Sequence, residues 1–167
     1  MNKQELVLLD WARKVHQLEY AHCFQSLYFS KVEHWIGLSA FFVATVVAFA
    51  YRFPFISYPC VKEYILPLLA FTAAILTGYQ SFIKPGEKAE MHRKLGLEYE
   101  KIRHEMEVVI TSTNTTIDLE EKIKSIKEKW DSLSTVYVNE RHYVAAKAKV
   151  KSFNKYGDEL AFLPDLV

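Results

Sequence analysis

The sequence predicts an all-α membrane protein, in which a two-transmembrane-helix hairpin carries a cytoplasmic helical bundle. The N-terminal helix and a C-terminal antiparallel helix pair are expected to form that bundle. Two stretches of eighteen and twenty residues contain no Asp, Glu, Lys or Arg, whereas Lys84 to Lys155 is densely charged. Within the charged part, apolar residues recur at spacings of three and four, as in a helix with one buried face.

The first expected element is a cytoplasmic helix over residues 1–33. Its apolar stripe consists of Leu8, Trp11, Val15 and Leu18. Nothing from Trp11 to Tyr51 breaks a helix, so this helix should continue directly into the first span. We expect a single domain over 1–155, followed by a tail over 156–167.

The two uncharged stretches predict membrane spans over 34–52 and 64–83. At about 1.5 Å per residue they reach roughly 27 to 30 Å, the thickness of the hydrocarbon core of a bilayer. Two buried helices of a soluble bundle are the alternative, but this chain of 167 residues is too short to cover helices that are apolar on all sides. Aromatic residues stand at the expected boundaries, as in interfacial belts: Trp35, Tyr51, Tyr64 and Tyr79.

The connector between the spans is short and contains Pro54 and Pro59, which predicts a hairpin with both termini on one side. The connector side offers the cations Arg52 and Lys62. The terminal side is richer in cations, with Lys31, Lys84, Lys88, Arg93, Lys94, Lys101 and Arg103. The positive-inside rule therefore places both termini in the cytoplasm, with the spans in the inner membrane.

Small residues repeat every four positions in each span, which favours close helix packing in lipid. The alternative is that alanine is simply common in membrane helices. The stripe residues are Ala40, Ala44 and Ala48 in the first span, and Ala70, Ala74 and Gly78 in the second. Polar residues beside the second stripe either line water or bond a neighbouring helix: Thr72, Thr77, Gln80 and Ser81.

Two cytoplasmic helices are expected after the spans, over 87–110 and 119–150. Pro85-Gly86 interrupts the second span as it leaves the membrane. Asp118 and Glu121 resemble a capping box that opens the second of these helices. The two apolar seams predict an antiparallel pair. They consist of His92, Leu95, Tyr99, Ile102, Met106 and Val109 in the first helix, and Leu119, Ile123, Ile126, Trp130, Leu133 and Tyr137 in the second.

The end of the returning arm is rich in lysine. If the arm pairs along its whole length, its end lies near the bilayer, where cations can bind anionic lipid headgroups. A solvated helix end with favourable C-terminal cations explains the same residues equally well. The lysines concerned are Lys147, Lys149, Lys151 and Lys155.

Catalytic and cofactor-binding patterns are not found, and we expect no enzyme, no cofactor and no metal site. The net charge of +1 gives no indication of direct nucleic-acid binding. Two distant cysteines, Cys23 and Cys60, predict neither a disulfide framework nor a zinc site. His16, Tyr20 and His22 are interpreted as bundle residues, and the cluster Glu140–His142 as solvent-facing.

The stretch EKAEMHRKLGLEYEKIRHEM after a two-span hairpin resembles the SLATT domain, the SMODS- and SLOG-associating two-transmembrane effector. The residues that correspond to the family pattern are Glu87, Lys88, Ala89, His92, Gly96, Tyr99 and Ile102. The resemblance is strongest from Trp35 to about Val109. It is weaker over the N-terminal helix and Trp130–Ala145, and at the end STVYVNERHYV and FLPDLV depart from the family pattern.

The resemblance implies a membrane effector of bacterial anti-phage or abortive-infection systems. Such proteins act beside a partner nucleotidyltransferase, its nucleotide product or a reverse transcriptase. They permeabilise the inner membrane when triggered. Two helices cannot enclose a channel, so a pore requires a homo-oligomer. The alternative is a non-conducting, membrane-anchored scaffold that recruits a cytoplasmic partner enzyme.

His92 opens its seam about two turns past Ile83, where the second span is expected to meet the bundle. A neutral imidazole can bond two polar partners while its ring packs among apolar neighbours. We expect His92, with Tyr99 further along the seam, to anchor this junction. The bond would go to a backbone carbonyl or to a polar residue of the N-terminal helix, and a gating or ligand-sensing role is the alternative.

Overall fold

The computed structural model describes residues 3–52, 59–112, 116–133 and 136–156. This described part of the chain is almost entirely helical and contains no strand, which confirms the all-α prediction. Its elements in chain order are α1 (Lys3–Arg52), the π-helical turn η1 (Val61–Ile65), α2 (Leu66–Ile83), α3 (Pro85–Thr111), α4 (Thr116–Asp131) and α5 (Glu140–Ser152).

The chain divides into two compact units. The bundle unit comprises Met1–Ser26 and Glu90–Val167, and the apolar unit comprises Leu27–Ala89. Helix α1 runs without a break from the first unit into the second, as the absence of helix-breaking residues predicted.

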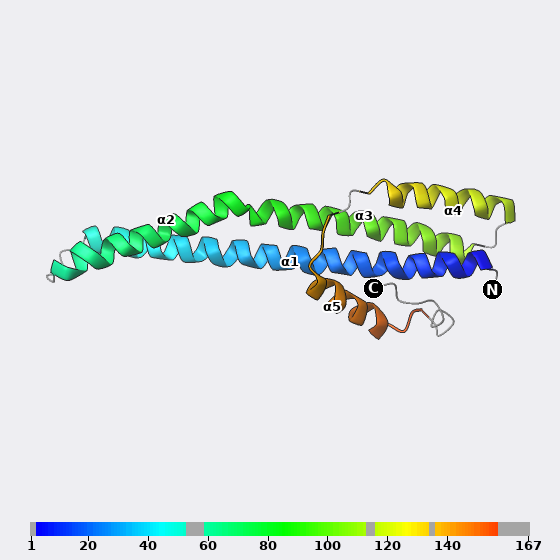
Figure 1. Ribbon diagram of the computed structural model, residues 1–167, viewed down its shortest axis with the longest axis horizontal. Helices are drawn as coiled ribbons and strands as arrows, with labels where there is room; N and C mark the ends of the chain where they lie inside the picture. Colours follow the sequence, from blue (N-terminus) through cyan, green and yellow to red (C-terminus); the bar gives the residue numbers. More distant parts are fainter. Residues whose placement is uncertain (1–2, 53–58, 113–115, 134–135, 157–167) are drawn as a thin grey trace. The chain divides into compact units, whose positions relative to one another are not determined.

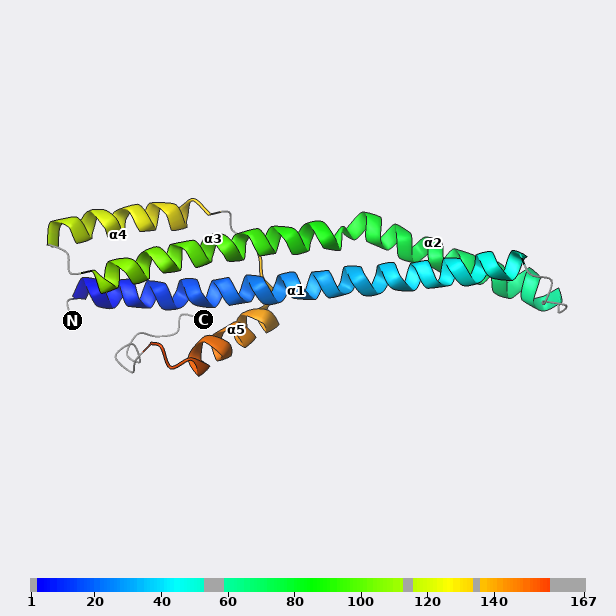
Figure 2. The same ribbon diagram turned by 180° about the vertical axis from the view of Figure 1, so that it is seen from behind.

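The core of the bundle unit lies between α1, α3 and α4. In Figures 1 and 2, α4 lies alongside α3 in both views. All six residues of the predicted α3 seam, from His92 to Val109, are buried. They pack with one stripe of α1 and with Ile126 of α4, which confirms the periodicity argument for these helices. The central core residues are Leu8, Ala12, Val15, Leu95, Tyr99, Ile102, Met106, Val109 and Ile126.

The single helix predicted over 119–150 is wrong, because α4 ends at Asp131 and α5 begins at Glu140. The predicted seam packs on the core as far as Leu133, but Tyr137 is 83% exposed. The sequence between the helices is rich in Ser, Thr and Val, which favour a helix weakly. Asn139 then caps α5, since its side-chain oxygen accepts a hydrogen bond from the Arg141 amide over 3.0 Å.

Helix α4 begins at Thr116, two residues before the expected cap. Asp118 therefore lies within the helix instead of preceding it as a cap.

In the apolar unit, the second half of α1 and α2 run antiparallel. Gly37 faces the Gln80 amide, and the Glu33 carboxylate occupies the space that a side chain at Gly86 would need. The Lys88 ammonium lies 5.7 Å from the centre of the Phe29 ring. In these contacts, residue numbers rise along α1 as they fall along the chain from Lys88 to Gln80, so the two segments are antiparallel.

The predicted interruption at Pro85-Gly86 is confirmed. Helix α2 ends at Ile83, and Lys84 adopts a left-handed conformation with φ of 48°. Helix α3 then starts at Pro85, where a missing backbone N–H costs no helical hydrogen bond. At the other end of α2, η1 holds the first residues of the predicted second span, and Pro54 lies outside the described residues.

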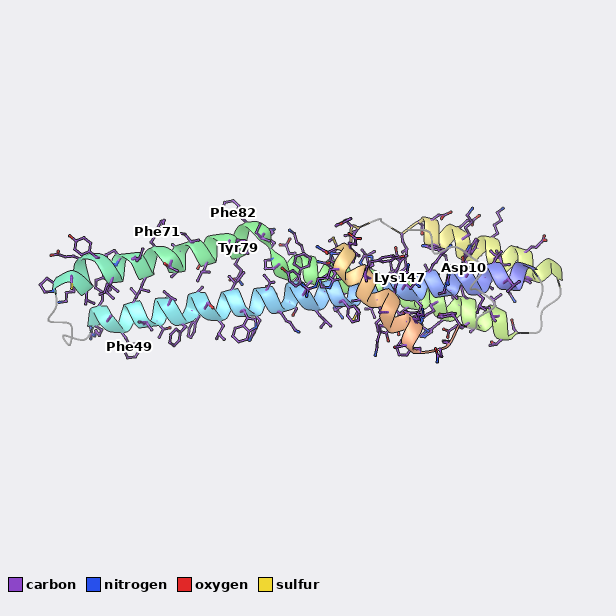
Figure 3. The ribbon with its side chains drawn as sticks, turned by 60° about the horizontal axis from the view of Figure 1, so that its bottom comes forward. Asp10, Phe49, Phe71, Tyr79, Phe82 and Lys147 are labelled. Carbon is purple, nitrogen blue, oxygen red and sulfur yellow. The ribbon has the colours of Figure 1, made fainter. Side chains whose placement is uncertain are left out.

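The apolar unit leaves most of its large hydrophobic side chains exposed. Figure 3 shows Phe71 and Phe82 pointing away from α1, and Phe49 pointing away from α2. Phe82 is 89% exposed. Only 6% of the most apolar stretch of either long helix is buried within the chain, whereas a core helix of a soluble protein is mostly buried. Length and composition thus allow both helices to cross a membrane.

Candidate functional site

A buried histidine pair joins α1 to α3 in the bundle unit. The Nδ1 atoms of His22 and His92 lie 2.9 Å apart, and the two residues are only 2% and 3% exposed. At this distance one Nδ1 carries a hydrogen and donates it to the other. The two neutral rings must therefore adopt opposite tautomers. The polar partner on the N-terminal helix that we expected for His92 is thus His22.

Tyr99 and Gly96 shape the surroundings of this pair. The Tyr99 ring stacks on His22, with the ring centres 5.4 Å apart and the planes 22° from parallel. A Cβ atom at Gly96 would lie 3.6 Å from the Glu19 carbonyl oxygen and 3.9 Å from the Cys23 amide nitrogen. The backbones of α1 and α3 therefore approach closely here, because Gly96 has no side chain to separate them.

Burial governs the ionisation of the pair. Burial, with a smaller contribution from the neighbouring His92, lowers the pKa of His22 to about 4. Burial also lowers the pKa of His92, with a smaller contribution from His142. The pKa of the Tyr99 hydroxyl is raised, again by burial. The environment thus favours the neutral form of every one of these groups.

The start of α5 is fastened beside the pair. The backbone N–H of Asn139 donates to the Oε1 atom of the buried Gln25 over 3.1 Å. His142, in the first turn of α5, is half-buried, and its charge acts on His92. The prediction that Glu140, Arg141 and His142 all face solvent is therefore correct for the first two and wrong for His142.

A second polar cluster surrounds Arg103 of α3. Its Nε donates to the Glu19 carboxylate over 2.7 Å and its Nη1 to the Glu107 carboxylate over 2.6 Å. Lys155 donates to the same Glu107 oxygen over 2.6 Å. Burial opposes the charge on Arg103, but its bonds to the two carboxylates outweigh burial and raise its pKa. The pKa of Glu19 is raised because burial outweighs the Arg103 bond.

The segment that follows α5 packs on His16 of α1. The Phe153 ring stacks on the imidazole with ring centres 5.7 Å apart and planes 8° from parallel. The Tyr156 hydroxyl lies 3.1 Å from His16 Nδ1 and donates to the Ala12 carbonyl over 3.3 Å. Burial, followed by the nearby charges of Arg103 and Lys155, lowers the pKa of His16 to about 4. Tyr156 thus belongs to the folded bundle, while the rest of the predicted tail lies outside the described residues.

These contacts also fix the direction of α5. The helix starts beside Gln25, and Tyr156 reaches Ala12, which precedes Gln25 by thirteen residues or about 20 Å of helix. The end of α5 therefore approaches Ala12 within the bundle unit. Contact of its lysines with lipid headgroups stays a prediction. Lys155 is bound to Glu107, and Lys149 lies over the Phe153 ring at 5.1 Å, while Lys147 is half-buried and Lys151 is exposed.

The small residues of the two apolar helices do not pack against each other within one chain. Ala40 is buried, but Ala44, Ala48, Ala70 and Ala74 are exposed. A Cβ atom at Gly78 would meet nothing within 4 Å. Helix packing through the four exposed alanines and Gly78 would therefore involve another molecule, whereas Ala40 is already covered within the chain.

The polar residues predicted as pore-lining differ in their surroundings. The Thr72 and Thr77 hydroxyls donate to the carbonyls of Leu68 and Ala73 in their own helix. Ser81 is exposed, whereas the Gln80 amide rests on Gly37 of α1. Gln80 thus serves helix packing within the chain, and the other three residues leave both uses open.

Sequence reasoning missed the roles of His22, Gln25 and Arg103. His22 and Gln25 continue the stripe of Leu8, Trp11, Val15 and Leu18 at the same alternating spacing of four and three. Extending that stripe by one further turn would have indicated both residues. The spacing of four between Arg103 and Glu107 could have indicated one ion pair, but no signal indicated the pair with Glu19, which comes from a distant part of the chain.

Among the described residues, no group of three or more His, Cys, Asp or Glu side chains could hold a metal ion. Comparisons of the whole chain with protein-family models, with curated proteins and with solved structures find no match.

Proposed function

We propose that this chain is a multi-pass protein of the inner membrane, with α2 and the second half of α1 as a transmembrane hairpin. Both termini and the bundle unit lie in the cytoplasm. The observation that carries this proposal is the exposure of both apolar helices. Large side chains such as Phe41, Phe71 and Phe82 require an apolar environment, and within the described part of the chain they are exposed.

The charge distribution supports this orientation. On the terminal side, the first apolar stretch is preceded by Lys31, and the second is followed by Lys84 and Lys88. The connector side carries Arg52 and Lys62. Basic residues near the ends of spans are retained in the cytoplasm.

In this membrane the chain acts as an effector that forms a pore or otherwise disrupts the bilayer, as the resemblance to SLATT proteins implies. It serves bacterial anti-phage defence by abortive infection. A partner nucleotidyltransferase or reverse transcriptase, or a nucleotide product of the former, supplies the trigger. The outward-facing small residues support assembly of several copies, because close helix contact in lipid depends on such residues.

A non-conducting scaffold that recruits a cytoplasmic enzyme is the second candidate. Its supporting observation is the sparse polar lining of the apolar unit, where Thr45, Thr72 and Thr77 all bond their own helices. Each hydroxyl hydrogen is thus used within its own helix, so these residues cannot donate to an anion, and only their oxygen lone pairs remain for a cation.

Dye release from liposomes distinguishes the two candidates. We expect wild-type protein to release carboxyfluorescein, and Gly78→Leu to abolish both release and oligomers in detergent while the chain still inserts. The Cβ atom added at Gly78 meets nothing within 4 Å in the described part of the chain, so we expect the effect of the variant to arise between copies. Gly37→Leu is the matched control within the chain, since it displaces Gln80 instead. If the wild-type protein inserts and forms oligomers that bind a partner enzyme, but releases no dye, the result would favour the scaffold.

A further inference from the structure

The geometry of the His22–His92 pair limits how many protons the closed bundle can hold. In the neutral pair one Nδ1 donates and the other accepts over 2.9 Å. A first proton can be accommodated, because an imidazolium Nδ1–H still donates to a neutral Nδ1. With a second proton both Nδ1 atoms carry hydrogen, so neither can accept, and two like charges face each other in a buried site.

We propose that His22 and His92 form an acid-sensitive latch between α1 and α3, which holds the bundle unit closed near neutral pH and releases it on acidification. The latch is built from three helices. Gln25, one turn beyond His22, holds the start of α5, and His142 of α5 acts on His92. Separation of α1 from α3 at the pair therefore also disturbs the attachment of α5.

The surrounding groups do not offset an added positive charge. Tyr99 from α3 is stacked on His22, and burial keeps its hydroxyl protonated. The charge of His142 from α5 also lowers the pKa of His92. On α1 the nearby acid is Glu19, which is bound to Arg103, and burial raises the pKa of the Cys23 thiol and so keeps it neutral.

The sign of the pH effect follows from proton binding. In the open state both imidazoles meet water and titrate near pH 6.5, whereas the closed state binds one proton at most. Closure is therefore strongest above about pH 6.5 and weakens as the pH falls, by about tenfold to a hundredfold in the opening constant per pH unit. The lowered pKa values of the two rings agree with this direction.

Urea unfolding of the full-length protein in detergent tests the latch between pH 7.5 and 5, with EDTA present to exclude adventitious metal. Fluorescence of Trp11 and Trp130, whose rings meet edge-to-face at 5.9 Å, reports on the bundle. The double variant His22→Asn/His92→Asn keeps an amide hydrogen bond but cannot titrate. For each pH unit, we expect the factor by which the unfolding constant changes to be about ten to a hundred times larger in the wild type than in the double variant.

His104→Asn is the matched control, because His104 is an exposed histidine of the same α3 helix that bonds Arg103 over 3.1 Å instead of the pair. Its loss should change the pH slope less than loss of the pair does. His16→Asn separates the contribution of the other buried histidine of α1. Equal slopes for the wild type and the double variant would overturn the proposal.

If the double variant does not fold, the proposal can still be tested on the wild-type protein alone. We expect the ring signals of His22 and His92 in NMR spectra to shift only as the bundle opens. Ordinary titration near pH 6.5 in a closed bundle would overturn the latch. The inference does not rest on the proposed function, because every group it uses lies in the bundle unit.

Discussion

Arg103 illustrates how a single charged residue is held inside the bundle. Its guanidinium bonds two carboxylates, and its side chain is almost completely covered. Removal of one partner of a buried ion pair leaves the other charges uncompensated, which is more costly than loss of an exposed pair. We expect Arg103→Met to lower the free energy of unfolding by about 3 kcal/mol at pH 7.5, measured by urea unfolding.

Lys101 provides the control on the same helix. It bonds Glu98 over 2.6 Å, but the side chains of both residues are largely exposed, at 67% and 48%. Exposed pairs of this kind contribute about 0.5 kcal/mol or less, so Lys101→Met should unfold close to the wild type. Equal destabilisation by the two variants would show that the burial of Arg103 has no energetic role.

Also at the scale of residues, the sequence indicated only one of the two histidines of the candidate site. His92 stood out because it opens a seam of apolar residues, and all of that seam is buried. His22 did not stand out, because a histidine near the end of a stripe is an ordinary bundle residue. Periodicity shows which residues face a partner helix, but it does not show which two of them meet.

At the scale of elements, the docking of α5 depends on a few aromatic contacts around His16. Phe153 and Tyr156 cover the imidazole, and burial is the main cause of its pKa of about 4. We expect Phe153→Ala/Tyr156→Ala to raise this pKa toward 6.5, measured by NMR titration of the ring. The rise should be partial, because Arg103 still lowers the pKa.

Lys151→Ala serves as the control, since Lys151 is exposed and close in sequence to both aromatic residues. It should leave the pKa of His16 at its wild-type value. Because this pKa is lowered, docking of α5 is fully favourable above about pH 6.5 and weakens as the pH falls toward 4. An unchanged His16 pKa in the aromatic double variant would contradict the contact seen here.

The break between α4 and α5 shows what element-level patterns leave out. An apolar seam with helical spacing runs through Leu119, Trp130 and Leu133, and it continues formally to Tyr137. The chain nevertheless stops the helix at Asp131, and the Asn139 cap starts another in a new direction. A cap residue inside an apparent seam marks a possible end, but only packing decides whether the helix ends there.

At the scale of the whole molecule, length and composition predicted the elements well. Two uncharged stretches, a proline-glycine break and two seams account for α1, α2, α3 and α4. The final direction of α5 could not be predicted, because it depends on contacts between residues more than a hundred positions apart, such as Asn139 with Gln25. This direction places the end of α5 beside Ala12 within the bundle unit.

The two cysteines provide a test of the proposed membrane topology. Both are free and exposed, and they lie on opposite sides of the first predicted span. In intact cells an impermeant maleimide should label a variant that retains only Cys60 and spare one that retains only Cys23. The charge asymmetry keeps the lysine-rich ends inside and leaves the connector outside.

Cys23 requires a control before its protection is attributed to the membrane. Burial, together with the nearby Glu19, raises the pKa of its thiol, and a thiol reacts with maleimide mainly as the thiolate. The Cys23 variant must therefore become labelled once the membrane is permeabilised at a moderately alkaline pH. Labelling of Cys23 but not Cys60 in intact cells would reverse the orientation. Labelling of both before permeabilisation would show that the apolar helices do not separate two compartments, and both candidate functions would then fail together.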